Sequence, residues 1–513
     1  MKKFISLFLV LAMVLGLCAC GNSEQGGEQQ PFSVGFAKGD ITPSASSQLI
    51  GFFDDEPRMS NTVLDPIYAT CVAFTDTTGK TVLLFGLDLL YIYTNLFETV
   101  RKQISIETGI PTSHILFSAT HTHSAPGQGS KNTNSNDVIL KTCVRIAKEA
   151  LEDRKPAQMF TTFSRPERMN FVRHYIRSDG TFLGKGVDKI PKTELIGHMH
   201  KADNLLQLVK FTREGGKDVI LTNWQAHYFG TKSVDYYGIS GDYPTIYRNA
   251  LENTLNCHAA FVLGGSGNLT SSSKMTGETL SKSYIDHAQR LAEFAAEAAA
   301  NFQPAELGNI YLKEEIIKIP GGKNAGVNNH LYALGFGDFG CAFAPFEIFD
   351  NNAKAVREAS NWKYTFYASC SYGSGSNGYL PDKLAFTYSA YEAYGPNEVD
   401  YNYTPYPEGT AEFVQDKLIA MLNEIFTESG NEEKEREEGY DLALVPTTND
   451  KVYTNPAPIT EGERGFYCTQ MMEDGTTLKN ILIATKEVAD QIAQKTTMKL
   501  IFDDRNVVVG IAE

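Results

Sequence analysis

Two histidines separated by one residue, in the run Thr120-His-Thr-His-Ser-Ala-Pro-Gly127, are the side chains of this sequence best suited to bind a metal ion. The apolar residues 115–117 before them predict a buried strand, and the small residues after them predict a loop. Because side chains alternate along a strand, we expect His121 and His123 to project to the same side. An isolated pair of this kind also occurs as a loop hydrogen-bonding pair, so a metal site requires partners from elsewhere in the chain.

Three further residues at predicted strand ends or in loops offer metal-ligating atoms. His227 follows the apolar segment 218–224, and Glu347 ends the apolar run 343–348, where an acidic side chain is costly unless it is paired or coordinated. Tyr379 lies in the glycine-rich loop 373–381. A hydrolytic zinc ion needs three or four nitrogen or oxygen ligands and an open position for water. Spacing cannot group these residues, because long stretches of sequence separate them.

Composition excludes some classes of function. The formal net charge is -15 and basic clusters are absent from the sequence, which argues against a nucleic-acid partner. Among the eight cysteines there is no Cys-x-x-Cys pair, so a structural zinc ribbon is not expected. Cys71 and Cys341 stand in apolar segments, where cysteine acts as a small buried hydrophobe.

The N-terminus has the pattern of an export signal. Two lysines precede an apolar run at 4–17, which is too short to span a bilayer, and Leu17-Cys-Ala-Cys20 matches the bacterial lipobox. We expect residues 1–20 to be a lipoprotein signal peptide and lipobox, with Cys20 as the first, lipid-carrying residue of the mature protein. Residues 21–31 are polar and predict a flexible tether. The expected location is the outer face of the bacterial cell membrane, with the lipid anchor in the membrane surface.

The remaining sequence predicts an α/β fold, with mixed β-sheets packed together and covered by helices. Strands are predicted at 68–76, 81–87, 115–118, 205–211, 218–224, 259–263 and 307–318, with a hairpin-like pair at 331–346. Helices are predicted at 96–108, 135–152, 281–302 and 410–426. The charged run 429–439 is the best candidate for a domain boundary. We therefore expect one large domain at 32–428 and a small β-rich C-terminal module at 440–513.

Several motifs together resemble the neutral, non-lysosomal ceramidases, and in particular their shorter bacterial members. Besides the histidine run they are Gly39-Asp-Ile-Thr-Pro43, Asn223-Trp-Gln-Ala-His227, Ser240-Gly-Asp-Tyr-Pro244, Gly264-Gly-Ser-Gly-Asn268, Pro345-Phe-Glu347 and Asn377-Gly-Tyr379. They occur in the family's order and cover roughly residues 33 to 425. The resemblance implies a zinc-dependent amidohydrolase that cleaves the N-acyl amide of ceramide, or of a related lipid amide, to a fatty acid and a free amine.

Carried over by position, the resemblance implies a role for each candidate residue. The zinc ligands are His121, His227, Glu347 and Tyr379. The residues implied to face the substrate are His123, Tyr391 and Arg173. The implied mechanism is attack of a zinc-bound hydroxide on the amide carbonyl, which is available at neutral pH because zinc lowers the pKa of bound water to ~7.

The sequence departs from the family pattern in two places. Asn268 and Thr270 stand where family members have aspartate and serine, a change that a zinc-hydroxide mechanism tolerates and a covalent serine mechanism does not. The segment 440–513 does not match the family's immunoglobulin-like C-terminal domain. Three alternatives remain open at this point: a zinc hydrolase of a different amide or ester, a serine hydrolase, and a non-catalytic lipid- or glycan-binding lipoprotein. The serine hydrolase is disfavoured because Gly264-Gly-Ser-Gly-Asn268 lacks the final glycine of the nucleophile-elbow pattern.

Overall fold

The computed structural model describes most of the chain from residue 30 to residue 512. The segments outside the described part within that span are 53–55, 178–181, 232–233, 276, 323, 374–377, 388–389, 395–405, 442–446, 449–452, 455–459, 463–464, 473–476, 484 and 503–507. The predicted signal peptide, Cys20 and nearly all of the tether lie outside the described residues. Among the helices that are described, none has both the length and the hydrophobicity needed to cross a bilayer.

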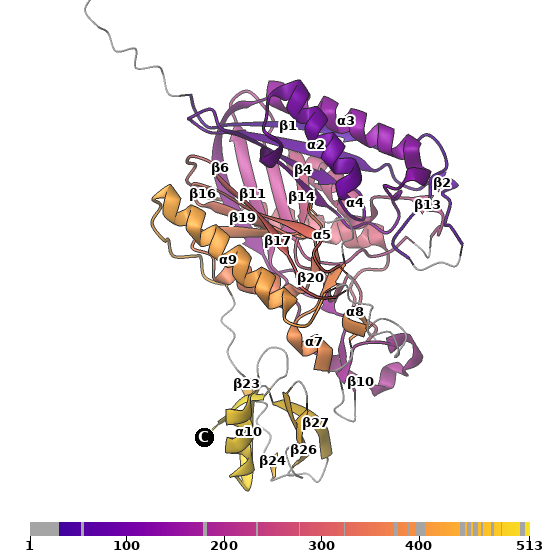
Figure 1. The fold of residues 1–513 in the computed structure, drawn as a ribbon, viewed down its shortest axis with the longest axis vertical. Helices are drawn as coiled ribbons and strands as arrows, with labels where there is room; N and C mark the ends of the chain where they lie inside the picture. Colours follow the sequence, from indigo (N-terminus) through magenta and orange to yellow (C-terminus); the bar gives the residue numbers. More distant parts are fainter. Residues whose placement is uncertain are drawn as a thin grey trace, which may run out of the picture.

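A nine-stranded mixed sheet forms the centre of the molecule (Figure 1). Its strands are β1 (Ser33–Asp40), β3 (Tyr68–Thr75), β4 (Thr81–Leu87), β5 (Ile115–Ala119), β6 (Lys155–Ser164), β11 (Leu206–Arg213), β12 (Val219–Trp224), β14 (His258–Leu263) and β16 (Gln303–Ala305). They follow the order β14-β12-β11-β6-β1-β3-β4-β5, with β16 paired to β6. The pairs β4–β5 and β12–β14 are parallel, and the other pairs are antiparallel.

The two edge strands of this sheet, β14 and β5, are brought together by residues 369 and 370, which hydrogen-bond to both. The Ser369 N–H donates to the carbonyl of Leu263 at the end of β14 at 2.8 Å, and the Ala119 N–H at the end of β5 donates to the carbonyl of Cys370 at 3.3 Å. A Cβ on Gly86 of β4 would lie 3.0 Å from the carbonyl oxygen of Phe261 of β14, so these strands also approach closely. The carboxyl ends of the two parallel pairs therefore face a common region, which is where ligands bind in α/β proteins.

Helices cover this sheet, as the sequence predicts. They are α2 (Thr94–Thr108), α3 (Thr133–Glu152), α4 (Asp242–Leu255) and α5 (Tyr284–Ala299). Figure 1 shows α2 and α3 side by side across one face. The α5 helix begins after Ser283, whose hydroxyl accepts a hydrogen bond from the N–H of Asp286, a typical N-cap. The buried faces of α3 and α5, including Ile146 and Leu291, belong to the main hydrophobic core.

A second sheet packs against the first. It has the order β17 (Tyr311–Lys318), β18 (Asn328–Phe336), β19 (Phe339–Phe343) and β21 (Tyr364–Ala368). Alternate side chains of its strands enter two cores, because successive residues of a strand face opposite sides. Leu334 and Phe336 join the core of the large sheet, whereas Ala333 packs with Leu418 of α9 (Thr410–Ser429) in a separate cluster. This layer of sheet, sheet and helix confirms the expected fold class.

Short elements near the predicted site complete the large domain. The paired strands are β2 (Thr62–Val63) with β13 (Gly238–Ile239), β7 (Phe171–Val172) with β15 (Leu269–Thr270), β20 (Glu347–Ile348) with β22 (Tyr379–Leu380), and the three-stranded set β8 (Tyr175–Arg177), β9 (Phe182–Leu183) and β10 (Leu195–His198). The short helices are α6 (Asp350–Glu358), α7 (Lys383–Thr387), α8 (Tyr391–Tyr394), η1 (Thr112–His114), η2 (Ser130–Asn132), η3 (Val187–Lys189) and η4 (Lys192–Glu194). Most of the predicted site residues stand on or beside these short elements.

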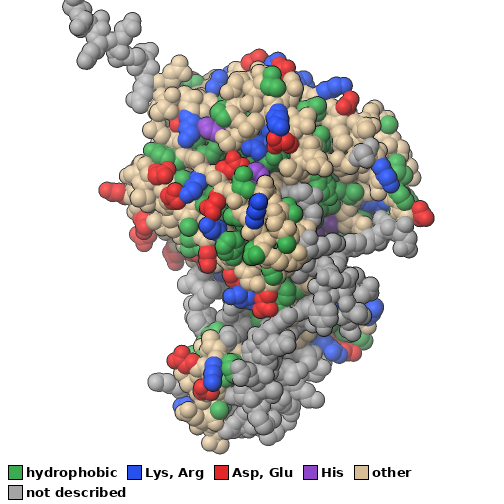
Figure 2. Space-filling model, viewed as in Figure 1, with side chains coloured by type: hydrophobic (Ala, Val, Ile, Leu, Met, Phe, Trp, Pro, Cys, Tyr) green, Lys and Arg blue, Asp and Glu red, His purple; other side chains and the backbone are tan. Residues whose placement is uncertain are grey.

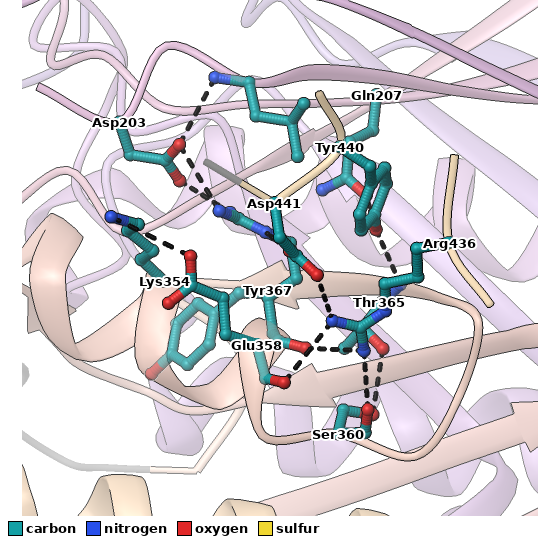
Figure 3. A network of polar contacts seen from close by, with 12 residues as sticks. Asp203, Gln207, Lys354, Glu358, Ser360, Thr365, Tyr367, Arg436, Tyr440 and Asp441 are labelled. Carbon is teal, nitrogen blue, oxygen red and sulfur yellow. Dashed lines mark hydrogen bonds and ion pairs between the residues drawn. The ribbon is translucent and has the colours of Figure 1, made fainter. Parts of the chain in front are cut away.

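The charged segment after α9 packs along the large domain (Figure 3). The Arg436 guanidinium donates to the backbone carbonyls of Ser360 at 2.5 Å and Trp362 at 3.1 Å and pairs with Asp441 at 2.7 Å. The buried Tyr440 hydroxyl donates to Gln207 at 2.5 Å and accepts the N–H of Thr365 at 3.0 Å. The segment is thus partly embedded, and the exact domain boundary near it stays a prediction.

The C-terminal residues form their own β-rich unit, as predicted. Its strands are β23 (Thr447–Thr448), β24 (Tyr453–Thr454), β25 (Thr460–Gly462), β26 (Gly465–Met472), β27 (Thr477–Ile483), β28 (Thr497–Phe502) and β29 (Val508–Ala512), and its helix is α10 (Lys486–Ala493). Val488 and Ile492 of α10 pack with Leu500 and Val508 of the sheet in a small separate core.

The charged surface agrees with the composition. On the face shown in Figure 2, Lys and Arg side chains are scattered among Asp and Glu rather than gathered into one patch. Five of the cysteines, Cys71, Cys143, Cys257, Cys341 and Cys370, are buried free thiols.

Candidate active site

The loop after β5 carries His121 and His123 into the interior of the domain. The N–H groups of Thr120 and His121 donate to the carbonyls of Leu87 and Leu89 at 2.8 and 2.9 Å, so this loop runs beside the end of β4. The strand ends at Ala119, and His121 has φ 62°, a left-handed conformation that is uncommon for histidine. The two imidazoles do meet, with Nε2 atoms 3.3 Å apart. They meet because of this turn and not, as the sequence suggested, because of strand alternation.

The end of β12 brings His227 to the same place. Its ring centroid lies 4.6 Å from that of His121 and 5.2 Å from that of His123. All three histidines are buried, and their ligand nitrogens lie within 4.8 Å of one another, an arrangement able to hold a metal ion. The ring of His123 also stacks on Tyr228, with centroids 3.8 Å apart.

Glu347 completes the cluster from β20. Its Oε2 lies 3.1 Å from Nε2 of His121 and 3.9 Å from Nε2 of His227, while its Oε1 accepts a hydrogen bond from the Tyr91 hydroxyl. The Oε2 atom is buried and makes no hydrogen bond of acceptable geometry. Burial of a carboxylate oxygen without a hydrogen bond is costly. Because this oxygen faces imidazole nitrogens, the arrangement is suited to bind a metal ion.

Backbone carbonyls orient two of the rings for coordination. The Nδ1 atom of His121 lies 3.0 Å from the carbonyl of Leu90, and that of His227 lies 3.3 Å from the carbonyl of Ser266. A ring that donates its Nδ1 proton to a carbonyl keeps Nε2 free as a neutral ligand atom, as metal-binding histidines usually do. The donor set of imidazole nitrogens and one carboxylate therefore fits a zinc-like divalent cation.

Electrostatics within the cluster favour a positive charge beside Glu347. Burial by itself lowers the pKa of His121, but the Glu347 carboxylate and the Cys370 thiol raise it, and the result lies well above the ordinary value. Burial and the charge on His121 lower the pKa values of His123 and His227 well below the ordinary value. The site thus attracts one positive charge next to the carboxylate and disfavours further protonation of its neighbours.

The other predicted site residues lie on one side of this cluster. Tyr379 stands opposite Glu347 in the parallel β20–β22 pair, and its ring centroid lies 6.5 Å from that of His227. The guanidinium of Arg173 lies over the ring of Tyr379 at 5.1 Å, and the Tyr391 ring centroid lies 6.0 Å from that of Tyr379. All seven residues predicted to act on metal or substrate are therefore assembled, although they come from distant parts of the sequence.

Comparison with known proteins places this arrangement on a familiar scaffold. The chain is similar to the crystal structure of neutral ceramidase from Pseudomonas aeruginosa, with a TM-score of 0.60 and 14% identity over 86% of this chain and 84% of that one. It is similar to a ceramidase complexed with C2 as well, with a TM-score of 0.61 and 13% identity over 93% of this chain and 90% of that one. The chain has a ceramidase-like fold. No family model and no curated protein sequence matches it.

The ceramidase-like fold leaves the division of labour among the site residues as a prediction. The geometry groups His123 with His121 and His227 as nitrogen donors, whereas the sequence resemblance gives His123 a substrate-facing role. Tyr379 is beside the cluster, and burial raises its pKa well above the ordinary value for tyrosine. The assignments of zinc to Tyr379 and of substrate contacts to Tyr391 and Arg173 stay predictions.

The structure also reveals site residues that the sequence did not indicate. Tyr91 binds Glu347, and the Cys370 thiol lies 3.6 Å from Nδ1 of His121. Neither residue belongs to a recognisable motif. Glu392 is fully buried and receives Arg173 Nε at 2.5 Å and His174 Nε2 at 2.8 Å. Its signal was present in the sequence, because an acidic residue next to Tyr391 interrupts a run of small and aromatic residues.

Asn268, one of the two residues that depart from the family pattern, has a structural role here. The Asn268 side chain donates to Oδ1 of Asp350 at 2.7 Å and accepts the Asp350 N–H at 2.9 Å, which fastens its loop to the start of α6. Ser266, the serine of the rejected nucleophile elbow, is buried and contacts His227 through its carbonyl. Within the described part of the chain no hydrogen bond joins the Ser266 hydroxyl to a histidine base, so the structure gives no support to a serine hydrolase.

A cavity of about 400 Å³ adjoins the cluster. Arg173, His227, Tyr228, Thr270 and Tyr391 form the part of its wall that belongs to the site. Its volume is within the range of pockets that bind small molecules. The site therefore has both a place for a metal ion and an adjacent space for a substrate.

Proposed function

We propose that this protein is a zinc-dependent amidohydrolase that cleaves the N-acyl amide of ceramide or of a related lipid amide. The observation that carries the proposal is the buried cluster of His121, His123 and His227 around Oε2 of Glu347, on a ceramidase-like fold. A decayed site would have no reason to keep a buried carboxylate among three imidazoles, since burial of such groups is costly without a ligand.

The chain's own side chains supply positioning and proton transfer. A zinc ion in the cluster would polarise the amide carbonyl and lower the pKa of an attacking water. Arg173 is held by Glu392 and by the carbonyl of Gly267, at 2.5 and 2.6 Å, so its guanidinium cannot swing away from the cavity. We expect Arg173 and Tyr391 to orient the substrate carbonyl, and His123 to move a proton to the leaving amine.

An apolar surface beside the site supports a lipid substrate. Met59, Val63, Val234 and Tyr237 are exposed on or next to the paired strands β2 and β13 (Figure 1). Phe52 connects this surface to the site, because its ring centroid lies 5.3 Å from that of His123 and 5.7 Å from that of Tyr236. Exposed apolar groups next to a catalytic cavity are typical of proteins that take substrates from a lipid phase.

We further propose that the mature protein is anchored by lipid on Cys20 to the outer face of the bacterial membrane. The support is the lipobox Leu17-Cys-Ala-Cys20 and the polar tether that follows it. Metabolic labelling with a palmitate analogue tests this directly: the label should be lost in Cys20→Ser, and a labelled Cys20→Ser protein would refute the anchor.

Metal analysis together with a substrate panel tests the enzymatic proposal. We expect one equivalent of zinc in the wild type and in His258→Ala, a control histidine on β14 that stacks on Phe36, and none in His121→Ala. Fluorescent ceramide and other fatty amides and esters should be tested with and without a chelator. Cleavage of another amide but not ceramide would leave the mechanism and change the substrate. A well-folded wild type without zinc would refute the proposal.

A further inference from the structure

The cavity beside the metal cluster contains positive charge that the described residues do not fully balance. Besides Arg173, its wall includes Lys185 and Lys274, with Asp188 as the acidic residue of the wall. This is unexpected in a chain with a formal net charge of -15. Arg173 has a role towards a neutral amide, whose carbonyl it would orient, but a neutral lipid gives no role to a further cation, whose desolvation is costly.

Ion pairs account for two of the three cations. Lys274 Nζ lies 2.5 Å from Oδ1 of Asp188, and both side chains are well exposed. Arg173 is paired with the buried Glu392. The third cation of the wall is Lys185. It is half-buried, and within the described part of the chain no carboxylate is paired with it.

The backbone places Lys185 next to the predicted catalytic groups. The carbonyl of Gly184, one residue before it, accepts the N–H of Tyr391 at 3.0 Å. Gly186, one residue after it, has φ 66°, a left-handed conformation that glycine adopts without strain, and it precedes η3. The backbone of Lys185 is therefore held between a contact to the site and a tight turn, and its side chain belongs to the cavity wall.

The rest of the wall is suited to hydrocarbon. Tyr175, Val187, Phe229 and Leu269 also line the cavity and offer apolar or aromatic surface. A ligand that satisfies both features is an amphiphile with a hydrocarbon part and one anionic group. We infer that the substrate is an acyl amide that carries a carboxylate, which pairs with Lys185 while the amide lies at the metal cluster. This inference rests on the proposed function, and it differs from it by excluding a neutral ceramide as the preferred substrate.

Chain-matched amides test the inference on the zinc-loaded full-length protein. The probes are N-lauroylglycine, with the carboxylate on the amine side, N-lauroylethanolamine, which is neutral, and an ω-carboxylauroyl ethanolamide, with the carboxylate on the acyl side. We expect kcat/KM for one of the two carboxylates to exceed that of the neutral amide by about tenfold or more, since a charge-assisted contact at a half-buried site has this effect. Which carboxylate is preferred shows which side of the amide enters the cavity.

Variants at position 185 identify the residue responsible. Lys185→Gln should reduce the preference for the carboxylate mainly through KM, Lys185→Glu should reverse it, and Lys185→Arg should restore it. Lys189→Ala is the matched control, because Lys189 is an exposed lysine of the same segment that does not line the cavity. It should leave the preference unchanged.

The possible results separate this inference from the proposed function. If carboxylate and neutral amides are cleaved equally and Lys185→Glu changes nothing, the inference is wrong while the hydrolase stands. If neither fluorescent ceramide nor any of these amides is cleaved, the proposed function fails, and calorimetric binding of N-lauroylglycine still decides the inference. Binding that is at least tenfold weaker in Lys185→Glu would support the anionic site, and equal binding would refute it.

Discussion

Gly267 controls the position of the proposed metal ligand Glu347. It lies in the loop between β14 and β15, and its N–H donates to the carbonyl of Ile348 at 2.8 Å, so the loop and β20 are in direct contact. A Cβ at position 267 would lie 2.4 Å from the carbonyl oxygen of Glu347 and 3.0 Å from that of Ile348. Both obstacles are backbone atoms, which cannot rotate away as the end of a side chain can.

The size of the expected displacement follows from these distances. Contacts of this kind do not fall below 3.0 Å, so in Gly267→Ala the loop that carries residue 267 and the backbone at Glu347 must separate by at least about 0.6 Å from their 2.4 Å contact. Metal sites tolerate deviations of about 0.2 Å in ligand distance. We therefore expect zinc affinity to fall by about 100-fold or more, given that even indirect ligand perturbations cost about 10- to 100-fold. The free energy of unfolding should fall by about 1–3 kcal/mol from overpacking.

The assay is a competition for zinc between the protein and a chromophoric chelator, accompanied by urea unfolding of the metal-free protein. Gly35→Ala is the matched control, because its Cβ would also clash with a backbone carbonyl oxygen, that of Ala150 in α3. Both variants should lose stability, and only Gly267→Ala should lose zinc. The reasoning is refuted if Gly267→Ala is destabilised as expected and still binds zinc with wild-type affinity, since Glu347 would then not be a ligand whose position matters.

Three further predictions concern the histidines and two buried carboxylates. His121→Ala should abolish zinc binding, whereas His123→Ala should keep the metal and lose turnover; loss of metal in both would make His123 a ligand and refute the division of roles. Burial raises the pKa of Glu392, but His174 and Arg173 lower it more, to about 2, from the ordinary value of 4.5 for glutamate. This carboxylate therefore contributes stability above pH 4.5 that is lost as the pH falls towards 2, roughly 3 kcal/mol in all. The stability difference between wild type and Glu392→Gln in urea should accordingly shrink from pH 6 to pH 3, and a constant difference would contradict it. Arg248→Met should cost about 3–5 kcal/mol in urea unfolding, because Asp88, 2.6 Å from the guanidinium, would be left buried without a cation; a variant as stable as the wild type would show that Asp88 is not charged.

Much of the scaffold could be predicted from the sequence because local hydrophobic patterns determine it. The strand predicted at 81–87 is β4 (Thr81–Leu87), and the helix predicted at 96–108 differs from α2 only at its first two residues. These elements bury apolar side chains with the period of a strand or a helix, which is readable in one segment alone. Helix ends were less well predicted: the N-cap of α5 is Ser283, so the helix begins after the predicted start at 281.

The sequence predicted which residues form the site. It did not predict the backbone conformation that brings them together or the neighbouring residues that contact them. The sequence indicated His121 and His123 as a pair through strand alternation, yet β5 ends before them and a left-handed His121 brings the rings together. Such a backbone conformation depends on the hydrogen bonds to Leu87 and Leu89, which no local pattern encodes. Tyr91 and Cys370 were missed for the same reason, since each acts only through a neighbour distant in sequence.

The sequence by itself determined the α/β layering, the elements that cover the sheets, and which side chains could bind a metal ion. Only the tertiary structure decided that those side chains meet. The ends of β5 and β14 are joined through Ser369 and Cys370, which brings the histidine loops together and leaves Glu347 between them. The physical reason is that a hydrophobic pattern is set by neighbouring residues of the chain and can be read in one segment. A metal centre depends on contacts between distant segments, and the free energy of burying its polar side chains together arises only once the sheet has brought those segments together.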